Sequence, residues 1–442
     1  MDRFDHMDSI AVRGGILSVL LVSVTGLSGQ VLSLSQCIDS AMVNERRIQM
    51  AGTDERIAEE RIREARGQLI PKLRGTADYR YYTDLPYQLM PASIFGGPAD
   101  TYRAIQFGTP QNVSANIALH VPIYDPSAFG ALQVTREAAA MATLQNERTR
   151  EEVVMEVSAV YYNAQILQSK LAFLDSNVVN ADALARTLEL LHTQLLARGT
   201  DVDRLKLQRD QLLTQREQVR SQFEQVLDAL RILTGMNLGT TVQLEDIQPA
   251  EMNASSGTRT TTGLRSTDQA IRLKHAELRA VQRARIPSLA GQGMYGTTGF
   301  GRIGPDDRFD FYPIGLLGLQ LQVPLFQGTV LQHKIKGKKL ELEKMTLQRD
   351  ALLDKEGMER RTTERQITVA QQAITNGDAQ LELAGRIRRN TVLQHREGVA
   401  STTELILADQ SEREAQQNYL NALVDLCKAQ LELQRLNGNL LK

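Results

Sequence analysis

Two glycine-rich segments could in principle cradle a phosphate group. Residues 291–296 (GQGMYG) and 299–304 (GFGRIG) both fit the pattern G-x-G-x-x-G. In a dinucleotide site this motif follows a strand and opens a helix, so that the backbone can approach a pyrophosphate. Neither segment opens a helical pattern, and Pro305 follows the second segment directly. Glycines in a strand or a turn explain both segments better, and we expect no cofactor.

The residue types that hold metals or carry out hydrolysis show no functional spacing. Six histidines are scattered without an HExxH pair, and Cys37 and Cys427 have no CxxC or histidine neighbour. No phosphate-binding loop ending in GK[ST] is present, so energy for any transport must come from another protein. Gln36 is a poor residue for lipoprotein cleavage before Cys37. We therefore predict a protein that is not an enzyme, binds no metal and carries no lipid anchor.

Charge and composition exclude further classes. The 442 residues include 51 Lys plus Arg and 52 Asp plus Glu, so no cationic excess is available for nucleic acid. Aromatic residues make up only 5% and Trp is absent, which favours thin elements packed along their lengths over a thick core. After the N-terminal segment no apolar run reaches 18 residues, which excludes a bundle of membrane-spanning helices.

The first 29 residues have the layout of a secretory signal peptide. Arg3 and Arg13 precede an apolar run from Ile16 to Leu27, and small residues follow at 28 and 29. Three aspartates among the first eight residues make the charged region atypical, which leaves a buried N-terminal helix as the alternative. We expect cleavage between residues 28 and 30, and hence export.

Several short sequence segments occur twice along the chain, in the same order. Residues 70–79 (IPKLRGTADY) and 286–295 (IPSLAGQGMY) agree at five of ten positions. Farther along, Val121-Pro122 corresponds to Val323-Pro324, and Arg198-Gly199 corresponds to Glu397-Gly398, at intervals of 77 and 74 residues from proline to glycine. Because order and spacing recur together, the sequence predicts an internal two-fold repeat. The junctions between strands and helices are expected at Pro71, Pro122, Pro287 and Pro324.

Each half is predicted to contain a helix, two strands, a very long helix and a shorter helix. In the first half, Ser35 is a possible cap of a helix over 33–68, and residues 127–197 would form a rod of roughly 100 Å. Residues 201–236 carry a heptad seam of apolar side chains. The second half repeats this plan over 267–286, 328–397 and 402–436, with a kink or local break expected at glycines within its long helix. Those glycines are Gly337, Gly357, Gly377 and Gly385.

This organisation divides the chain into four parts. They are a signal peptide at 1–29, a first repeat at 30–250, a polar linker at 251–265 and a second repeat at 266–442.

The predicted strands have one apolar and one polar face. Residues 113–121 and 317–323 alternate between apolar and polar side chains over lengths that suit a tilted bilayer crossing. A half-buried strand of a soluble sheet would show the same alternation. If the polar face lines a water-filled lumen, the lumen residues are Asp78, Arg80, Asn116, His120, Gln320 and Gln322.

Four strands cannot close a membrane barrel, because an open edge in hydrocarbon leaves backbone groups unpaired. We therefore expect three copies to supply twelve strands around one lumen, with residues 84–111 forming a loop on one rim. The predicted fold is a mixed α and β membrane protein with a trimeric 12-stranded β-barrel, to which each chain contributes four strands.

With these features the chain resembles the TolC family of outer-membrane factors. The resemblance rests on residues 34–38 (LSQCI), the two Pro-x-Leu strand starts, both Val-Pro strand exits and the paired glycine breaks. It implies a homotrimer in the outer membrane of a Gram-negative bacterium, in which a 12-stranded outer-membrane β-barrel is continued into the periplasm by a long α-helical coiled-coil barrel. It also implies a conduit for drugs or secreted polypeptides that docks a periplasmic adaptor protein and an energised inner-membrane transporter.

The resemblance further implies that the glycine breaks lie at a periplasmic tip, where acidic residues narrow the pore and adaptors dock. The residues concerned are Arg198, Gly199, Asp201, Asp203, Glu397, Gly398 and Glu404. Helix capping is the alternative role, since acids in a first turn satisfy free N–H groups and residues 401–404 (STTE) form a capping box. The alternative function is a periplasmic coiled-coil adaptor or scaffold without a pore.

Overall fold

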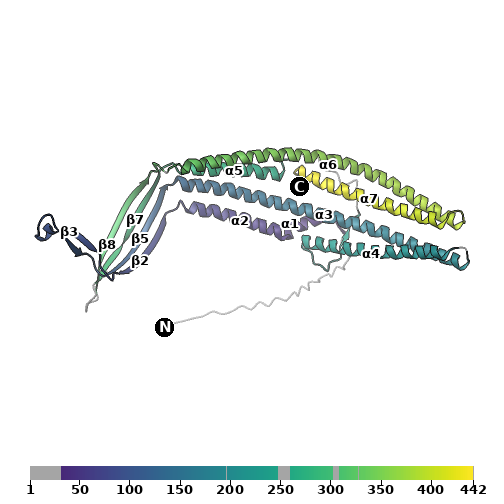
Figure 1. The fold of residues 1–442 in the computed structure, drawn as a ribbon, viewed down its shortest axis with the longest axis horizontal. Coiled ribbons are helices and arrows are strands. Elements are labelled where there is room, and N and C mark those ends of the chain that lie inside the picture. The colour runs from purple at the N-terminus through teal and green to yellow at the C-terminus, as the bar shows by residue number, and fades with distance from the viewer. Residues whose placement is uncertain (1–30, 196, 247–258, 302–307, 327, 442) are drawn as a thin grey trace, which may run out of the picture.

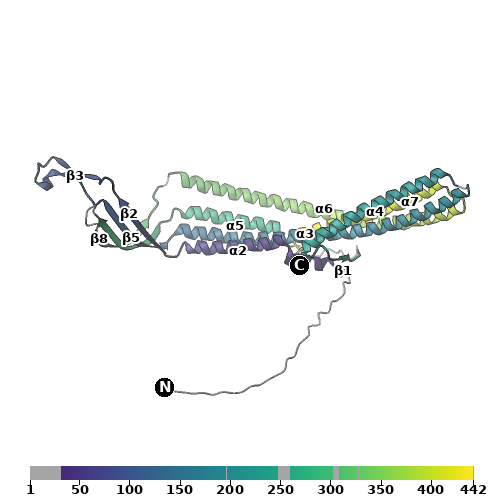
Figure 2. The ribbon, with the colours of Figure 1, turned by 90° about the horizontal axis from the view of Figure 1, so that it is seen from below.

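The structure is a computed structural model, which describes residues 31–195, 197–246, 259–301, 308–326 and 328–441. The molecule is elongated, with a β-sheet at one end and two long helical hairpins extending from it (Figures 1 and 2). The expected signal peptide at 1–29 and residues 251–258 of the expected linker lie outside the described residues.

The first predicted helix is divided into two. Helix α1 spans Leu34–Asn44 and α2 spans Arg46–Gly67, because Glu45 between them has an extended backbone with ψ of 124°. Ser33, and not Ser35, caps α1: its Oγ accepts from the Gln36 amide at 3.3 Å. The Gln36 side chain accepts from the Ser33 amide at 3.1 Å, which completes a capping box.

The long helix of the first half is α3, Pro126–Thr193, which is followed by α4, Gly199–Thr234. Asp125 caps α3, since its Oδ1 accepts from the amides of residues 127 and 128 at 2.9 and 3.1 Å. Helices α2, α1 and α4 follow one another along α3 (Figure 1). The predicted heptad seam of α4 faces α3, and its buried members are Leu205, Leu212, Val219, Leu230 and Leu233.

The second half contains α5 at Thr262–Arg283, α6 at Val330–Arg396 and α7 at Thr402–Leu436. Helix α6 runs as one element through all four of its glycines, so the expected local break is wrong. Gly377 and Gly385 lie where α6 approaches α7 closely: a Cβ added at Gly377 would come within 3.4 Å of the Tyr419 Cα. Close helix packing explains these two glycines.

Four strands form one antiparallel sheet in the order β2-β5-β7-β8. They span Lys72–Tyr81 (β2), Gln111–Tyr124 (β5), Ser288–Gly301 (β7) and Phe309–Gln322 (β8). Strands β2 and β8 are its two edges. The element order predicted for each half is therefore present in both halves. The internal sequence repeat and the four-part division stay predictions.

Two short sheets were not predicted. Within the expected rim loop, β3 (Tyr87–Pro91), the 3₁₀ helix η1 (Ala92–Phe95) and β4 (Tyr102–Gln106) form a hairpin that projects beyond the main sheet (Figure 2). Strands β1 (Val31–Leu32) and β6 (Gln243–Leu244) pair in parallel and tie the start of the described chain to the segment after α4.

A small core lies where α1, α3 and α4 meet, and Cys37 is fully buried in it. Burial raises the pKa of Cys37 to about 11 and that of Cys427 to about 12, so both stay protonated at neutral pH. Among the helices that the structure describes, none has a segment both long and apolar enough to span a bilayer.

Candidate functional site

The strand register gathers the predicted lumen residues on one face of the sheet. Residues directly opposite in an antiparallel pair point to the same side, and Asp78 pairs with Ser114 while His120 pairs with Lys72. The Ser114 hydroxyl donates to Asp78 Oδ2 at 2.6 Å, and the Arg80 guanidinium donates to Asp78 Oδ1 at 2.8 Å. Asn116, Gln320 and Gln322 fall on the same face by register.

The opposite face is apolar and uncovered. Leu73, Leu119 and Leu317 lie in one row across the sheet, and the side chains at its two edges are highly accessible. Leu317, Leu319 and Leu321 are 88%, 75% and 64% exposed. A soluble sheet would bury such a face against another layer, and no other element of the described chain covers this one. The half-buried soluble strand is therefore the weaker interpretation.

Aromatic side chains mark both ends of the apolar face. At the end nearer the β3–β4 hairpin, the register aligns Tyr79 with Phe311 and Tyr81 with Phe309 across the sheet. At the helix end, Tyr124 lies on the same face with its ring centroid 6.3 Å from that of Phe129. Aromatic girdles at both interfaces are typical of membrane strands. Sequence reasoning missed the girdles, because their alignment requires the register.

The prolines expected at strand and helix junctions occupy three kinds of position. Pro71 and Pro287 directly precede β2 and β7, and Pro324 follows the end of β8. Pro122 lies inside β5, which continues to Tyr124. The ladder tolerates Pro122 because the register with β7 shifts between residues 122 and 124.

The first hairpin tip, between α3 and α4, does not turn at the expected glycine. Gly199 is the first residue of α4, and among the described residues of this tip the left-handed conformation belongs to Leu195, with φ of 65° and a side chain 92% exposed. Arg198 is the N-cap of α4 and makes no side-chain cap bond. Asp201 lies in the first helical turn, 3.8 Å from the Arg204 guanidinium, and Asp203 is exposed.

The second tip, between α6 and α7, turns as expected. Gly398 has φ of 75°, a conformation that glycine adopts without strain, and Glu397 is the C-cap of α6. The predicted capping box is present: Ser401 Oγ accepts from the Glu404 amide at 3.2 Å, and Glu404 Oε2 accepts from the Ser401 amide at 2.7 Å. Glu404 therefore caps α7, and it is also exposed at the tip.

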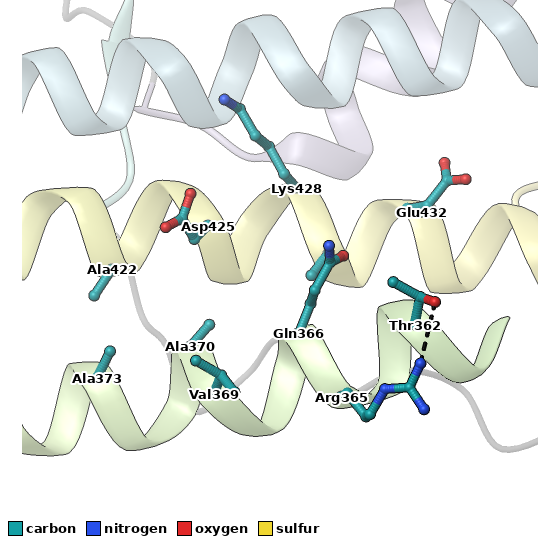
Figure 3. A pocket seen from close by; sticks show the side chains of 11 residues that line it. Thr362, Arg365, Gln366, Val369, Ala370, Ala373, Ala422, Asp425, Lys428 and Glu432 are labelled. Atoms are coloured by element: carbon teal, nitrogen blue, oxygen red, sulfur yellow. Dashed lines mark hydrogen bonds between the residues drawn. The ribbon is translucent and has the colours of Figure 1, made fainter. Parts of the chain in front are cut away.

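A groove of about 670 Å³ runs between α6 and α7, nearer the middle of the molecule. Figure 3 shows Val369 and Ala370 from α6 on one side and Ala422 from α7 on the other, with charged side chains at the margin. The charges are of both signs: Arg365 and Lys428, with Asp425 and Glu432. Such a groove suits packing more than chemistry. Among the described residues no three His, Cys, Asp or Glu side chains could together hold a metal ion.

Comparison with known proteins gives a consistent result. The family model for outer membrane efflux proteins matches residues 37–235. Outer membrane protein TolC of Escherichia coli is 21% identical over 342 residues, which cover 73% of this chain and 65% of TolC. The match thus spans less than two thirds of that relative's length.

Solved structures share the fold over nearly the whole chain. The outer membrane protein VceC of Vibrio cholerae superimposes with a TM-score of 0.73 at 13% identity, covering 92% of this chain and 96% of VceC. CusC, whose structures describe transmembrane channel formation, gives 0.77 at 13% identity, covering 94% and 95%. The comparisons confirm the expected resemblance to TolC-like outer-membrane factors, and they confirm an outer-membrane location with an extension into the periplasm.

Proposed function

We propose that this chain, an outer-membrane protein resembling TolC-like factors, forms a passive conduit from the periplasm to the exterior. Three copies would close a 12-stranded barrel, and their helices would continue the lumen as a periplasmic cylinder. The cargo would be small molecules or polypeptides, delivered through a periplasmic adaptor by an inner-membrane efflux or type I secretion transporter. The observation that carries the proposal is the sheet with an uncovered apolar face and two unpaired edges.

The edges require neighbours if the sheet lies in lipid. An unpaired backbone N–H or C=O in hydrocarbon costs several kcal/mol, and β2 and β8 each present a row of such groups. Pairing β8 of one copy with β2 of the next would satisfy both edges and give the same antiparallel order as within the chain. It would also join apolar face to apolar face and polar face to polar face.

The dimensions also fit a bilayer. From Val113 to Tyr124 an antiparallel strand extends roughly 37 Å, which a tilt of about 40° reduces to roughly 28 Å along the membrane normal. The hydrocarbon core is about 30 Å thick. The two aromatic girdles would then lie at its two surfaces, and the helical hairpins would extend into the periplasm (Figure 1).

The test is the assembly state and conductance of the purified full chain. We expect extraction only with detergent, a trimer by light scattering, and stepwise currents in planar bilayers. A cysteine at Ile314 in β8 should crosslink to one of a series of cysteines placed along the same face of β2 in another copy, at Lys72, Arg74, Thr76, Asp78 and Arg80, because strand tilt in a closed barrel shifts the register between copies. Recovery of a dissolved monomer in buffer would favour the adaptor or scaffold alternative.

The tips are proposed as the gate and the adaptor docking site. Around a threefold axis, Asp203 and Glu404 would form rings of negative charge that favour cations. We expect the pair Asp203→Asn and Glu404→Gln to raise single-channel conductance and to lower cation selectivity. Glu414→Gln, an exposed change farther along α7, is the matched control. Unchanged currents in a folded trimer would reject the charged ring and leave capping as the role of Glu404.

A further inference from the structure

Basic side chains gather where the second-half helices meet the sheet. Residues 328–339, at the start of α6, contain four lysines and no acidic residue. Residues 278–290, from the end of α5 into β7, contain three arginines and no acidic residue. The chain as a whole has a net charge of −1, so this excess is local.

Most of these cations have no partner charge. Lys338 is held by Glu277 and Glu341 at 2.8 and 2.9 Å. The remaining six form no ion pair within the part of the chain that the structure describes, and all but the half-buried Arg283 are exposed. We name these six side chains the basic belt: Arg279, Arg283, Arg285, Lys334, Lys336 and Lys339.

Helix stability does not explain the lysines of the belt. Arginines at the C-terminal end of α5 complement its macrodipole, which accounts for part of their placement. The lysines lie in the second and third turns of α6, beyond the first turn in which the macrodipole acts, and they form no ion pair among the described residues. Helix stability therefore gives no reason for three exposed cations at this place.

Exposed apolar side chains lie directly beside the belt. Leu325 and Phe326, between β8 and α6, are 90% and 87% exposed. Along the chain the order is an apolar strand face, then an aromatic side chain, then lysines about 6–14 Å from the start of α6. From its centre outward a bilayer has a hydrocarbon, an interface and a headgroup layer. These layers favour apolar, aromatic and basic side chains, in the same order.

We propose that the basic belt binds the headgroups of anionic phospholipids in the periplasmic leaflet of the membrane that the sheet crosses. The proposal rests on the proposed function, because it requires the sheet to lie in that membrane. Charge complementarity and continuity with the apolar face select a lipid headgroup as the partner. The first half has no equivalent at its long helix: between Asp125 and Arg136 it contains no basic residue. The lipid contact is thus expected on the α5–α6 side of each copy.

The test measures lipid preference with the full-length protein in vesicles. Phosphatidylethanolamine vesicles would contain one fifth phosphatidylglycerol, and spin-labelled lipids of both kinds would report the ratio of immobilised anionic to zwitterionic lipid. We expect a ratio well above one that falls with added salt. The triple change Lys334→Gln, Lys336→Gln and Lys339→Gln should lower the ratio by at least about fivefold.

The matched control removes the same charge from the same helix away from the membrane. Lys355→Gln, Arg361→Gln and Arg365→Gln lie roughly 24 Å or more along α6 from the belt and should leave the ratio unchanged. An equal ratio for both lipids in the natural chain, or an unchanged ratio in the belt variant, would overturn the proposal. A belt variant that instead changes only the ion selectivity of the channel would place the lysines in the lumen and also overturn it. A chain that fails to enter vesicles at all would contradict the proposed function itself.

Discussion

The two helical hairpins have the same outline, but different forces hold them together. In the first hairpin, α3 and α4 meet through an apolar seam in which Leu174 and Val178 pack with Leu212 and Val219. Nearer the tip, Leu188 packs with Leu205. Apolar packing of this kind is nearly indifferent to salt and pH.

The second hairpin depends on small residues and charges. Gly377 and Gly385 let α6 approach α7, and Arg388 of α6 forms an ion pair with Glu412 of α7. Their side chains are only 16% and 14% exposed. The comparison shows that two long helices can be held together either by a seam of apolar side chains or by close approach at glycines with a largely buried ion pair. The first hairpin also has ion pairs, such as Lys206–Glu189, but those two side chains are 43% and 46% exposed, so single charge changes should affect the second hairpin more strongly.

The largest expected effect is at the buried ion pair. Glu412→Met leaves the Arg388 charge buried without its partner, which should destabilise the second hairpin by about 3 kcal/mol. The double change Arg388→Met and Glu412→Met should recover most of this loss, because no unpaired charge remains. Hydrogen exchange of α6 and α7 amides in the detergent-solubilised protein measures both.

Leu212→Ala is the reference change in the first hairpin, and the lost packing should destabilise that hairpin by about 2–5 kcal/mol. Because no charge is left unpaired, no second substitution can restore this loss by removing a charge. A double charge variant as unstable as Glu412→Met alone would show that packing, and not charge, decides stability in the second hairpin too.

The two hairpin tips should also respond differently to the same substitution, with smaller changes in stability. Gly398→Ala places a Cβ on a residue with φ of 75° and should destabilise the second tip by about 1–2 kcal/mol. Gly199→Ala should be neutral or slightly stabilising, because Gly199 is helical and its nearest neighbour, a His192 carbon, is 3.5 Å from the added atom.

Leu195→Gly should stabilise the first tip by about 1 kcal/mol, since it relieves a left-handed leucine. Hydrogen exchange of the residues around each tip is the measurement. Equal responses at Gly199 and Gly398 would restore the correspondence that the sequence suggested.

Sequence patterns were sufficient for the strands and the long helices. Alternation fixed the faces of β5 and β8, and the heptad seam fixed the buried side of α4, because both patterns report burial directly. The capping box at Ser401 was also predictable, since it depends on residues three positions apart.

What the sequence could not supply depends on distant contacts. The continuity of α6 through Gly377 and Gly385 depends on how α7 packs against it, and the aromatic girdles depend on strand register. At the first tip the sequence places a glycine at 199, but among the described residues it is Leu195 that takes the left-handed conformation which glycine usually adopts at the end of a helix.

Two glycines within α6 should differ in how much their replacement by alanine changes the stability of the helix. Gly357→Ala should stabilise α6 by about 1 kcal/mol, because an added Cβ meets nothing within 4 Å and alanine is the better helix former. Gly385→Ala should give no gain, since its Cβ would lie 3.3 Å from Glu412 Oε1, in the ion pair that joins the hairpin. Thermal unfolding followed by circular dichroism compares the two. A similar gain at both sites would mean that close approach is not what selects glycine at 385.

The smallest expected effect is the response of α5 to acid. Lys274 and Lys338 alternate with Glu277 and Glu341 in a closed network that joins α5 to α6, with N–O distances of 2.8–3.1 Å. Hydrogen bonds from Lys338 and Lys274 lower the pKa of Glu341, and they lower the pKa of Glu277 although burial of that carboxyl opposes them. A carboxyl with a lowered pKa in the folded state stabilises the fold above its ordinary pKa near 4.5, and this contribution is lost as the pH falls through the folded value.

Exchange of α5 amides should therefore accelerate several-fold between pH 6 and pH 3 after correction for intrinsic rates, with a modest size because the network is partly exposed and screened. The variant Glu277→Gln and Glu341→Gln should exchange faster at pH 6 and lose most of the pH dependence. Between α3 and α4 the ion pairs are single and exposed, such as Lys206–Glu189 at 2.6 Å, and the apolar seam carries most of the contact, so α4 amides should show a smaller acceleration over the same range. Equal acceleration of α5 and α4 amides, or an unaltered profile in the variant, would mean that the charges around α5 do not set its stability.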